Sequence, residues 1–134
     1  MSDETVMLLR LLLACGLGMA IGIEREIAGK PAGFRTHALV CLGAALFALV
    51  SVYAFETGAD RARIAAQVVT GVGFLGAGAI FLQKEGVVAG LTTAATIWTV
   101  AAIGLAAATG LYWVAVATTV ITLILLQSDR IFRR

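Results

Sequence analysis

Charge is scarce in this sequence. Asp, Glu, Lys and Arg together make up 13% of the 134 residues, whereas soluble domains usually carry about 25%. The charged residues are also clumped, so that long stretches between them are almost free of charge. The formal net charge of +2 is too small to indicate a nucleic-acid-binding surface. The composition therefore argues against a soluble domain and against a nucleic-acid partner.

Cysteine and histidine are almost absent. The two cysteines, Cys15 and Cys41, both fall inside apolar runs, which argues against a disulfide framework and against a two-cysteine metal site. We interpret them as small core residues. The one histidine, His37, has no second histidine or cysteine thiolate nearby in the sequence. No metal site and no cofactor are expected.

Residues for enzymatic chemistry are also few. The predicted topology places His37 and Asp60 at opposite faces of the membrane, and the serines are Ser2, Ser51 and Ser128. A nucleophile, a base and an orienting group cannot be assembled from this set. We therefore do not expect an enzyme.

Hydrophobic residues, in contrast, make up 60% of the chain. A membrane-spanning helix needs about 20 apolar residues, or about 17 at the short end. Five runs meet this need, at residues 5–23, 38–55, 64–82, 91–108 and 111–127. They are apolar on all sides, which favours helices over barrel strands. The first run follows Asp3 and Glu4 instead of basic residues, which is atypical of a signal peptide. The sequence predicts an all-α, polytopic bundle of five helices that forms a single domain over residues 1–134.

Basic residues favour one orientation of this bundle. With the N-terminus outside, the inner side carries Arg25, Lys30, Arg35, Lys84, Arg130, Arg133 and Arg134. The outer side has Arg61 and Arg63, and Arg10 lies within the first run. This bias follows the positive-inside rule. We predict an outer N-terminus and a cytoplasmic C-terminus.

Small residues are spaced for close helix packing. Ala14, Gly18 and Gly22 lie four apart along the first predicted helix, and Gly104 and Ala108 do the same in the fourth. Helices associate in lipid through such residues. A thin bundle also has a large surface relative to its interior, so we expect a homo-oligomer within the lipid bilayer.

A mixed-charge segment joins the first two predicted helices. Lys30, Pro31 and Gly33 predict a turn, and Thr36 is a possible N-cap of the second helix. The segment could be a solvated loop, a structured docking corner or a magnesium site, although two carboxylates among three bases suit a metal poorly. We favour a structured cytoplasmic corner. Its candidate site residues are Glu24, Arg25, Glu26, Lys30, Arg35, Thr36 and His37.

A second polar set precedes and enters the third predicted helix. Arg63 and Gln67 are i, i+4 neighbours, and Asp60 lies one turn before Arg63. Such residues usually face a bundle interior or a water-filled cavity, although snorkelling at the interface is the alternative. Arg10 is expected at a similar depth. Together these four residues form a candidate polar vestibule, with an Asp60–Arg63 or Asp60–Arg10 ion pair.

Glycines and threonines dominate the next two segments. Gly71, Gly73 and Gly76 match the spacing of a dinucleotide-binding fingerprint, but that motif needs a preceding strand. With Gly78, they indicate either close helix packing or a local helix break that exposes carbonyl groups. Further along, either Thr92 or Thr93 is expected to cap the fourth helix, and Thr96 to join interhelical packing rather than a hydroxyl-lined path.

Three ordered blocks of this sequence resemble a known family. They are residues 22–37 (Gly-Ile-Glu-Arg-Glu through Arg-Thr-His), residues 60–80, which include Gly71-Val72-Gly73-Phe74-Leu75-Gly76, and residues 90–98 (Gly-Leu-Thr-Thr-Ala-Ala-Thr-Ile-Trp). They are similar to the MgtC/SapB family of bacterial inner-membrane proteins. The resemblance extends from about Arg10 to about Leu125.

The resemblance implies a five-helix transmembrane domain of the bacterial inner membrane that is linked to growth at low magnesium. It implies a regulatory or accessory role in magnesium and ATP homeostasis, with ATP synthase or a magnesium transporter as possible partners. A transporter or channel for Mg²⁺, another cation or a small solute is the alternative. Longer members carry a soluble C-terminal domain, whereas this sequence ends at Arg134, so we expect the transmembrane domain alone.

Overall fold

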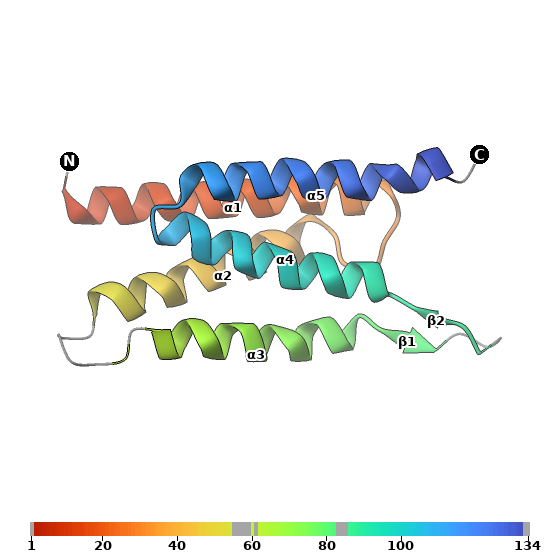
Figure 1. Cartoon of the computed structure of the whole chain (residues 1–134), viewed down its shortest axis with the longest axis horizontal. Coiled ribbons are helices and arrows are strands. Elements are labelled where there is room, and N and C mark those ends of the chain that lie inside the picture. The colour runs from red at the N-terminus through yellow and green to blue at the C-terminus, as the bar shows by residue number, and fades with distance from the viewer. Residues whose placement is uncertain (1, 55–59, 61, 83–85, 133–134) are drawn as a thin grey trace.

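Five helices make up almost all of the fold in the computed structural model, which describes residues 2–54, 60, 62–82 and 86–132. The helices are α1 (Asp3–Ile27), α2 (Phe34–Tyr53), α3 (Ala62–Gly78), α4 (Leu91–Ala108) and α5 (Tyr112–Phe132). Consecutive helices run in opposite directions, so that α1 begins and α5 ends at opposite ends of the bundle (Figure 1). The predicted all-α fold of five helices is confirmed.

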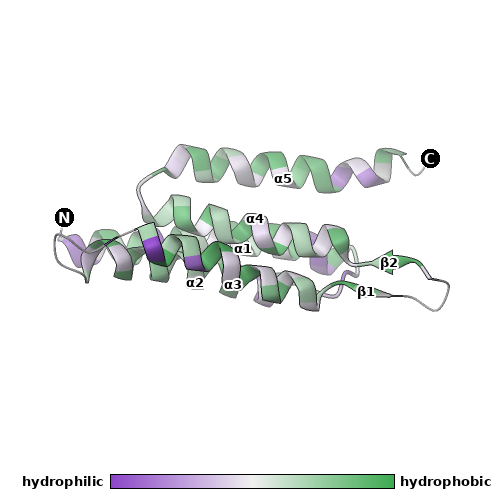
Figure 2. Cartoon of the chain, turned by 60° about the horizontal axis from the view of Figure 1, so that its bottom comes forward, coloured by the Kyte–Doolittle hydropathy of each residue, from purple (hydrophilic) through white to green (hydrophobic). Residues whose placement is uncertain are grey.

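Length and composition identify a membrane protein. Helices α1, α2, α4 and α5 are each long and apolar enough to cross a membrane. Helix α3 is shorter, with 17 residues, and extends about 25 Å at 1.5 Å per residue, against ~30 Å for a hydrocarbon core. Figure 2 shows hydrophobic colour along the helices, with hydrophilic segments gathered toward their ends. Which end faces the cytoplasm stays a prediction, and Arg61, Lys84, Arg133 and Arg134 lie outside the described residues.

Helix α3 ends at Gly78, four residues before the end of the predicted run. The backbone N–H groups of Ala79 and Ile80 donate to carbonyl groups three residues earlier, over 3.0 and 3.1 Å. This tighter pattern is common where an α-helix ends. The helix is continuous from Gly71 to Gly78, so a local break in this segment is excluded.

A short hairpin that the sequence did not predict follows α3. Strand β1 (Phe81–Leu82) pairs with the antiparallel strand β2 (Val88–Ala89), with Phe81 opposite Ala89. Aromatic and β-branched residues favour strands over helices, and Val87 also precedes β2. The apolar run at 64–82 therefore contains a helix and a strand instead of one long span.

Two helices begin at glycines and not at the predicted threonines. Helix α2 has Gly33 as its N-cap, so Thr36 lies inside the first turn. Helix α4 has Gly90 as its N-cap, with a φ of +89°, and a Cβ atom there would collide with the carbonyl oxygen of Ala79. Glycine adopts this left-handed conformation without a steric penalty. The predicted caps at Thr36 and at Thr92 or Thr93 are therefore wrong.

The best-packed part of the bundle is formed by α1, α2 and α4, which all contact one another. The predicted small-residue ridge of α1 is confirmed, because Ala14, Gly18 and Gly22 are all buried. A Cβ atom on Gly18 would lie 2.6 Å from Cys41 Cβ. From α4, a Cβ atom on Gly104 would meet the carbonyl oxygen of Cys41. Glycines thus bring both neighbours against the backbone of α2.

The other two helices lie on opposite sides of this core. Helix α5 packs against α4 and α1, whereas α3 packs against α4 and α2, as the two outer positions in Figure 1 show. In α3 only Val72 and Gly76 are buried. Most of the α3 surface is therefore left uncovered by the described part of the chain.

Candidate functional site

Arg25 is buried at the end of α1, with 3% of its surface exposed. Its Nε donates to Glu24 Oε2 over 2.8 Å, and its Nη2 to Glu24 Oε1 over 3.4 Å. A buried guanidinium needs such a partner, because removing its charge from water is costly. The Nη1 atom is also buried, and no described group accepts a hydrogen bond from it. The Arg25–Glu24 pair thus satisfies the charge but leaves the Nη1 nitrogen of the guanidinium without a described acceptor.

Glu26 joins the end of α1 to the start of α2. Its Oε2 accepts a hydrogen bond from the backbone N–H of Phe34 over 2.9 Å. A carboxylate at a helix N-terminus satisfies a free N–H group and interacts favourably with the helix dipole. Gly33 makes room for it, because a Cβ atom there would collide with the Glu26 carboxylate. The corner, residues 24–37, is therefore a packed junction held by its own side chains.

His37 is completely buried and connects α2 to α4. Its Nδ1 lies 2.9 Å from the carbonyl oxygen of Gly33, and its Nε2 lies 2.8 Å from Thr96 Oγ1. Thr96 Oγ1 lies 2.8 Å from the carbonyl oxygen of Thr93, to which it can donate. Both nitrogen atoms of the ring are therefore engaged inside the bundle. Sequence reasoning placed Thr96 in a separate set, because its 59-residue separation from His37 gave no signal of this contact.

These hydrogen bonds limit where the protons of the His37 ring and the Thr96 hydroxyl can lie. The Gly33 carbonyl can only accept, so Nδ1 must carry a proton. In a neutral ring Nε2 then accepts the hydroxyl proton of Thr96. If Thr96 instead donates to Thr93, Nε2 must also carry a proton and the ring is cationic. The direction of the Thr96 hydroxyl is thus coupled to the protonation state of His37.

The remaining candidate residues of the corner point outward. Arg35 and Thr36 are exposed and Lys30 is half-buried, and the Arg35 guanidinium lies 5.7 Å from the centre of the Phe34 ring. The structure therefore buries Arg25 and His37 and half-buries Glu24, while Glu26 and Arg35 lie at the surface. In the described ranges, no group of three or more His, Cys, Asp or Glu side chains could hold a metal ion.

At the other end of the bundle, Arg10 binds aromatic residues instead of Asp60. Its Nε donates to the Tyr112 hydroxyl over 2.8 Å, and its Nη1 lies 3.4 Å from the Tyr53 hydroxyl and 3.0 Å from the Ala108 carbonyl oxygen. Arg10 thereby ties α1 to α2, α4 and α5. The suggested Asp60–Arg10 pair is wrong, because α1 packs on the far side of α2 and α4 from α3 (Figure 1).

The rest of the candidate vestibule lies on α3. Asp60 Oδ1 accepts from the backbone N–H of Ala62 over 3.1 Å, and among the described side chains it forms no ion pair with Arg63. Arg63 and Gln67 both line a groove of about 800 Å³ between α2 and α3. The structure thus brings Arg63 and Gln67 together, and it separates Arg10 from them.

The predicted glycine and threonine positions serve different roles. A Cβ atom on Gly71, Gly73 or Gly78 would meet nothing within 4 Å, whereas one on Gly76 would lie 3.5 Å from the Ala94 carbonyl oxygen. Of the glycine-rich segment, only Gly76 therefore packs closely within the described part of the chain. On α4, Thr93 and Thr96 are buried and Thr92 is exposed.

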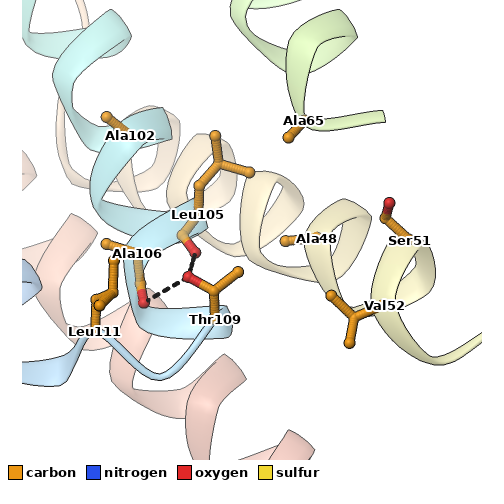
Figure 3. Close-up of a pocket in the computed structure, with 9 residues that line it drawn as sticks. All are labelled: Ala48, Ser51, Val52, Ala65, Ala102, Leu105, Ala106, Thr109 and Leu111. Carbon is orange, nitrogen blue, oxygen red and sulfur yellow. Dashed lines mark hydrogen bonds between the residues drawn. The ribbon is translucent and has the colours of Figure 1, made fainter. Parts of the chain in front are cut away.

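A smaller pocket of about 300 Å³ lies among α2, α3 and α4. Figure 3 shows Ala48, Ala65 and Leu105 around it, with Thr109 at one side. The Thr109 hydroxyl donates back to the carbonyl oxygen of Leu105 over 2.8 Å, which directs its polarity toward its own helix. Alanines on three helices leave this space, and their sequence spacing did not reveal it. Its lining offers little for catalysis or ion binding.

Comparison with known proteins matches residues 11–134 to the MgtC family. YhiD of Escherichia coli (strain K12), named "Putative magnesium transporter YhiD", is 49% identical over 127 residues, covering 90% of this chain and 59% of YhiD. Protein MgtC of Salmonella typhimurium (strain LT2) is 49% identical over 118 residues, covering 87% of this chain and 49% of MgtC. Protein SapB of Bacillus subtilis (strain 168) is 39% identical over 124 residues, covering 87% of this chain and 53% of SapB. The chain thus spans about half the length of the curated relatives it matches. No solved structure matches it.

Proposed function

Because this chain belongs to the MgtC family of membrane proteins, we propose that it is a non-enzymatic regulatory or accessory factor in magnesium and ATP homeostasis. It acts by binding other proteins in the bacterial inner membrane. ATP synthase and a magnesium transporter are the partners to test first. Self-association into a homo-oligomer belongs to the same proposal.

A ridge of exposed small residues on α3 carries this proposal. Ala66, Thr70, Gly73 and Ala77 follow one another at i, i+4, i+7 and i+11, and all four are exposed. No atom of the described chain lies within 4 Å of a Cβ placed on Gly73. Helices associate in lipid through close approach of small residues, because there is no hydrophobic driving force between them. This outward ridge, residues 66–77, therefore offers a docking face for a helix of another membrane protein.

The distribution of polar side chains favours regulation over transport. Among the described residues, the buried ionisable side chains with polar contacts are Arg25 and His37, both at the corner. The Arg10 cluster lies at the other end of the bundle. Between them the core contains mainly apolar residues such as Val100 and Ile103, and the buried hydroxyl groups of Thr119 and Thr122 donate to carbonyl groups of their own helix. A transporter needs polar groups along its path, so the transport alternative rests mainly on the name of YhiD and on the groove beside Arg63.

Reconstitution separates the two functions. The purified protein is placed in liposomes, and the flux of Mg²⁺, K⁺ and H⁺ is measured against empty liposomes. We expect the flux of each ion to be the same in liposomes with the protein as in empty liposomes. Flux that depends on Asp60 or Arg63, abolished by Asp60→Asn or Arg63→Ala, would establish transport and overturn the proposal.

Binding is tested with purified ATP synthase and a purified magnesium transporter in nanodiscs. Gly73→Leu places a large side chain on the outward ridge and should weaken association about tenfold or more, equivalent to about 1.4 kcal/mol. Gly16→Leu is the matched control, because Gly16 also has open space around it but lies on α1. Equal binding by both variants would show that the ridge is not the docking face.

A further inference from the structure

The groove between α2 and α3 is open because small residues line both of its walls. A Cβ atom on Gly43 of α2 or on Gly71 of α3 would meet nothing within 4 Å. Larger side chains flank them, with Leu39 and Phe47 on α2 and Leu75 on α3. These three are more than half exposed. The groove is thus apolar and opens to the outside of the bundle. In a membrane, lipid surrounds the bundle there.

Its polar side chains lie at one end. Arg63 and Gln67 belong to the first turns of α3, whereas Leu75 lies near the end of that helix. Twelve residues separate Arg63 from Leu75, which corresponds to about 18 Å along a helix. The hydrocarbon depth of one leaflet is about 15 Å, half of a 30 Å core. The groove therefore has a polar mouth and an apolar body of about the depth of a leaflet.

Within the described part of the chain, the positive charge of Arg63 at the mouth has no carboxylate partner. The nearest acid in the sequence, Asp60, directs Oδ1 to the backbone N–H of Ala62. A cation at the edge of a membrane is stabilised by an anionic partner or by the headgroup region. The missing anion is thus expected from outside the described chain.

We propose that this groove binds a phospholipid with an anionic headgroup. The phosphate accepts hydrogen bonds from the Arg63 guanidinium, the Gln67 amide donates to an ester carbonyl, and one acyl chain lies along the apolar body toward Leu75. An arginine forms strong, charge-assisted hydrogen bonds with a phosphate. A neighbouring apolar helix fits the same space less well, because it leaves Arg63 without an anion. An ethanolamine headgroup is also disfavoured, because its own ammonium group competes for the phosphate.

Native mass spectrometry of the full chain tests the proposal. The protein is purified in nanodiscs that contain equal amounts of phosphatidylglycerol and phosphatidylethanolamine, released, and examined for retained lipid. We expect retained phosphatidylglycerol in excess. Gly71→Leu fills the groove and should lower the retained lipid about tenfold, whereas Gly73→Leu, two residues along the same helix, should not. A tenfold loss corresponds to a tenfold change in the binding constant.

Two further variants test the headgroup contact and control for misfolding of Gly71→Leu. Arg63→Gln should abolish the preference for phosphatidylglycerol while total lipid binding persists. If Gly71→Leu does not give a helical, monodisperse protein, Gly43→Leu fills the groove from its other wall. Equal lipid retention by the groove-filling variants and by Gly73→Leu would overturn the proposal. It would also be overturned if filling the groove converts a dimer into monomers without changing retained lipid, because a second copy would then occupy it.

Discussion

The glycines of this protein are used in opposite ways on the two sides of the bundle. On the side of α1, α2 and α4, a Cβ atom on Gly18, Gly22 or Gly104 would collide with the neighbouring helix. On α3, Gly71 and Gly73 have open space around them. The same residue type thus closes contacts within the chain on one side and leaves surfaces open on the other.

This difference indicates that α3 serves contacts outside the chain. A glycine inside a helix is less favourable than alanine by about 1 kcal/mol, unless a close approach requires it. Gly18, Gly22 and Gly104 meet that requirement within the chain, whereas Gly16 of α1 does not. The glycines of α3, apart from Gly76, do not meet it either. We therefore expect the α3 glycines to allow close approach of molecules other than this chain. These are a partner helix at the outward ridge and a phospholipid in the groove between α2 and α3.

The largest expected effect comes from breaking the buried ion pair. Arg25→Ala leaves the Glu24 carboxylate without its partner at the corner, and removing one member of a buried pair typically costs about 3–5 kcal/mol. We expect a loss of this size in the free energy of unfolding, measured by denaturant titration in micelles. The variant Arg63→Ala, on the exposed face of α3, should change it by less than about 0.5 kcal/mol.

Equal losses of unfolding free energy in Arg25→Ala and Arg63→Ala would contradict the proposed difference between the α1–α2–α4 side and α3. They would mean that the α3 side contributes as much to folding as the α1–α2–α4 core. A small effect of Arg25→Ala would instead indicate that water reaches the corner and compensates the Glu24 carboxylate.

A smaller effect is expected from adding one methyl group to each class of glycine. Gly22→Ala forces a Cβ atom against the backbone of Phe34, and overpacking of this kind costs about 1–3 kcal/mol. Gly73→Ala adds the same group where nothing lies within 4 Å, so the folded protein should be as stable as the unmodified chain or slightly more stable. Thermal unfolding in the same micelles measures both. A destabilised Gly73→Ala protein would show that α3 is packed more closely than the structure indicates.

Much of the fold could be predicted because lipid restricts the choices. Apolar runs predicted all five helices, and the residues of α4 were predicted at 91–108, as found. The spacing of Ala14, Gly18 and Gly22 correctly indicated a packed ridge. These features are local, and helical periodicity in the sequence expresses them directly.

Features that depend on distant contacts or on backbone conformation were missed. The N-caps at Gly33 and Gly90 depend on a Glu26 carboxylate from the previous helix and on a left-handed φ, neither of which residue type alone reveals. Arg10 was expected near Asp60 because the sequence places both residues at a similar depth in the membrane. Depth alone does not tell which side of the bundle a helix occupies. The hydrogen bond from Arg10 to the Tyr112 hydroxyl was not predicted, because these residues are far apart in the sequence and only the fold brings them together.

An effect no larger than that of Gly22→Ala is expected from removing a single hydroxyl group in the packed core. Thr96→Val keeps the shape of the side chain but removes the group that bonds His37 Nε2, and leaving a buried polar atom unpaired costs about 1–3 kcal/mol. Thr96→Ser retains the hydroxyl and should recover most of that loss, whereas Thr92→Val, at an exposed position of the same helix, should have little effect. Unfolding free energies of the three variants, compared at one pH, measure the contribution of this bond. If Thr96→Val is as stable as Thr92→Val, the His37–Thr96 hydrogen bond does not stabilise the α1–α2–α4 side of the bundle.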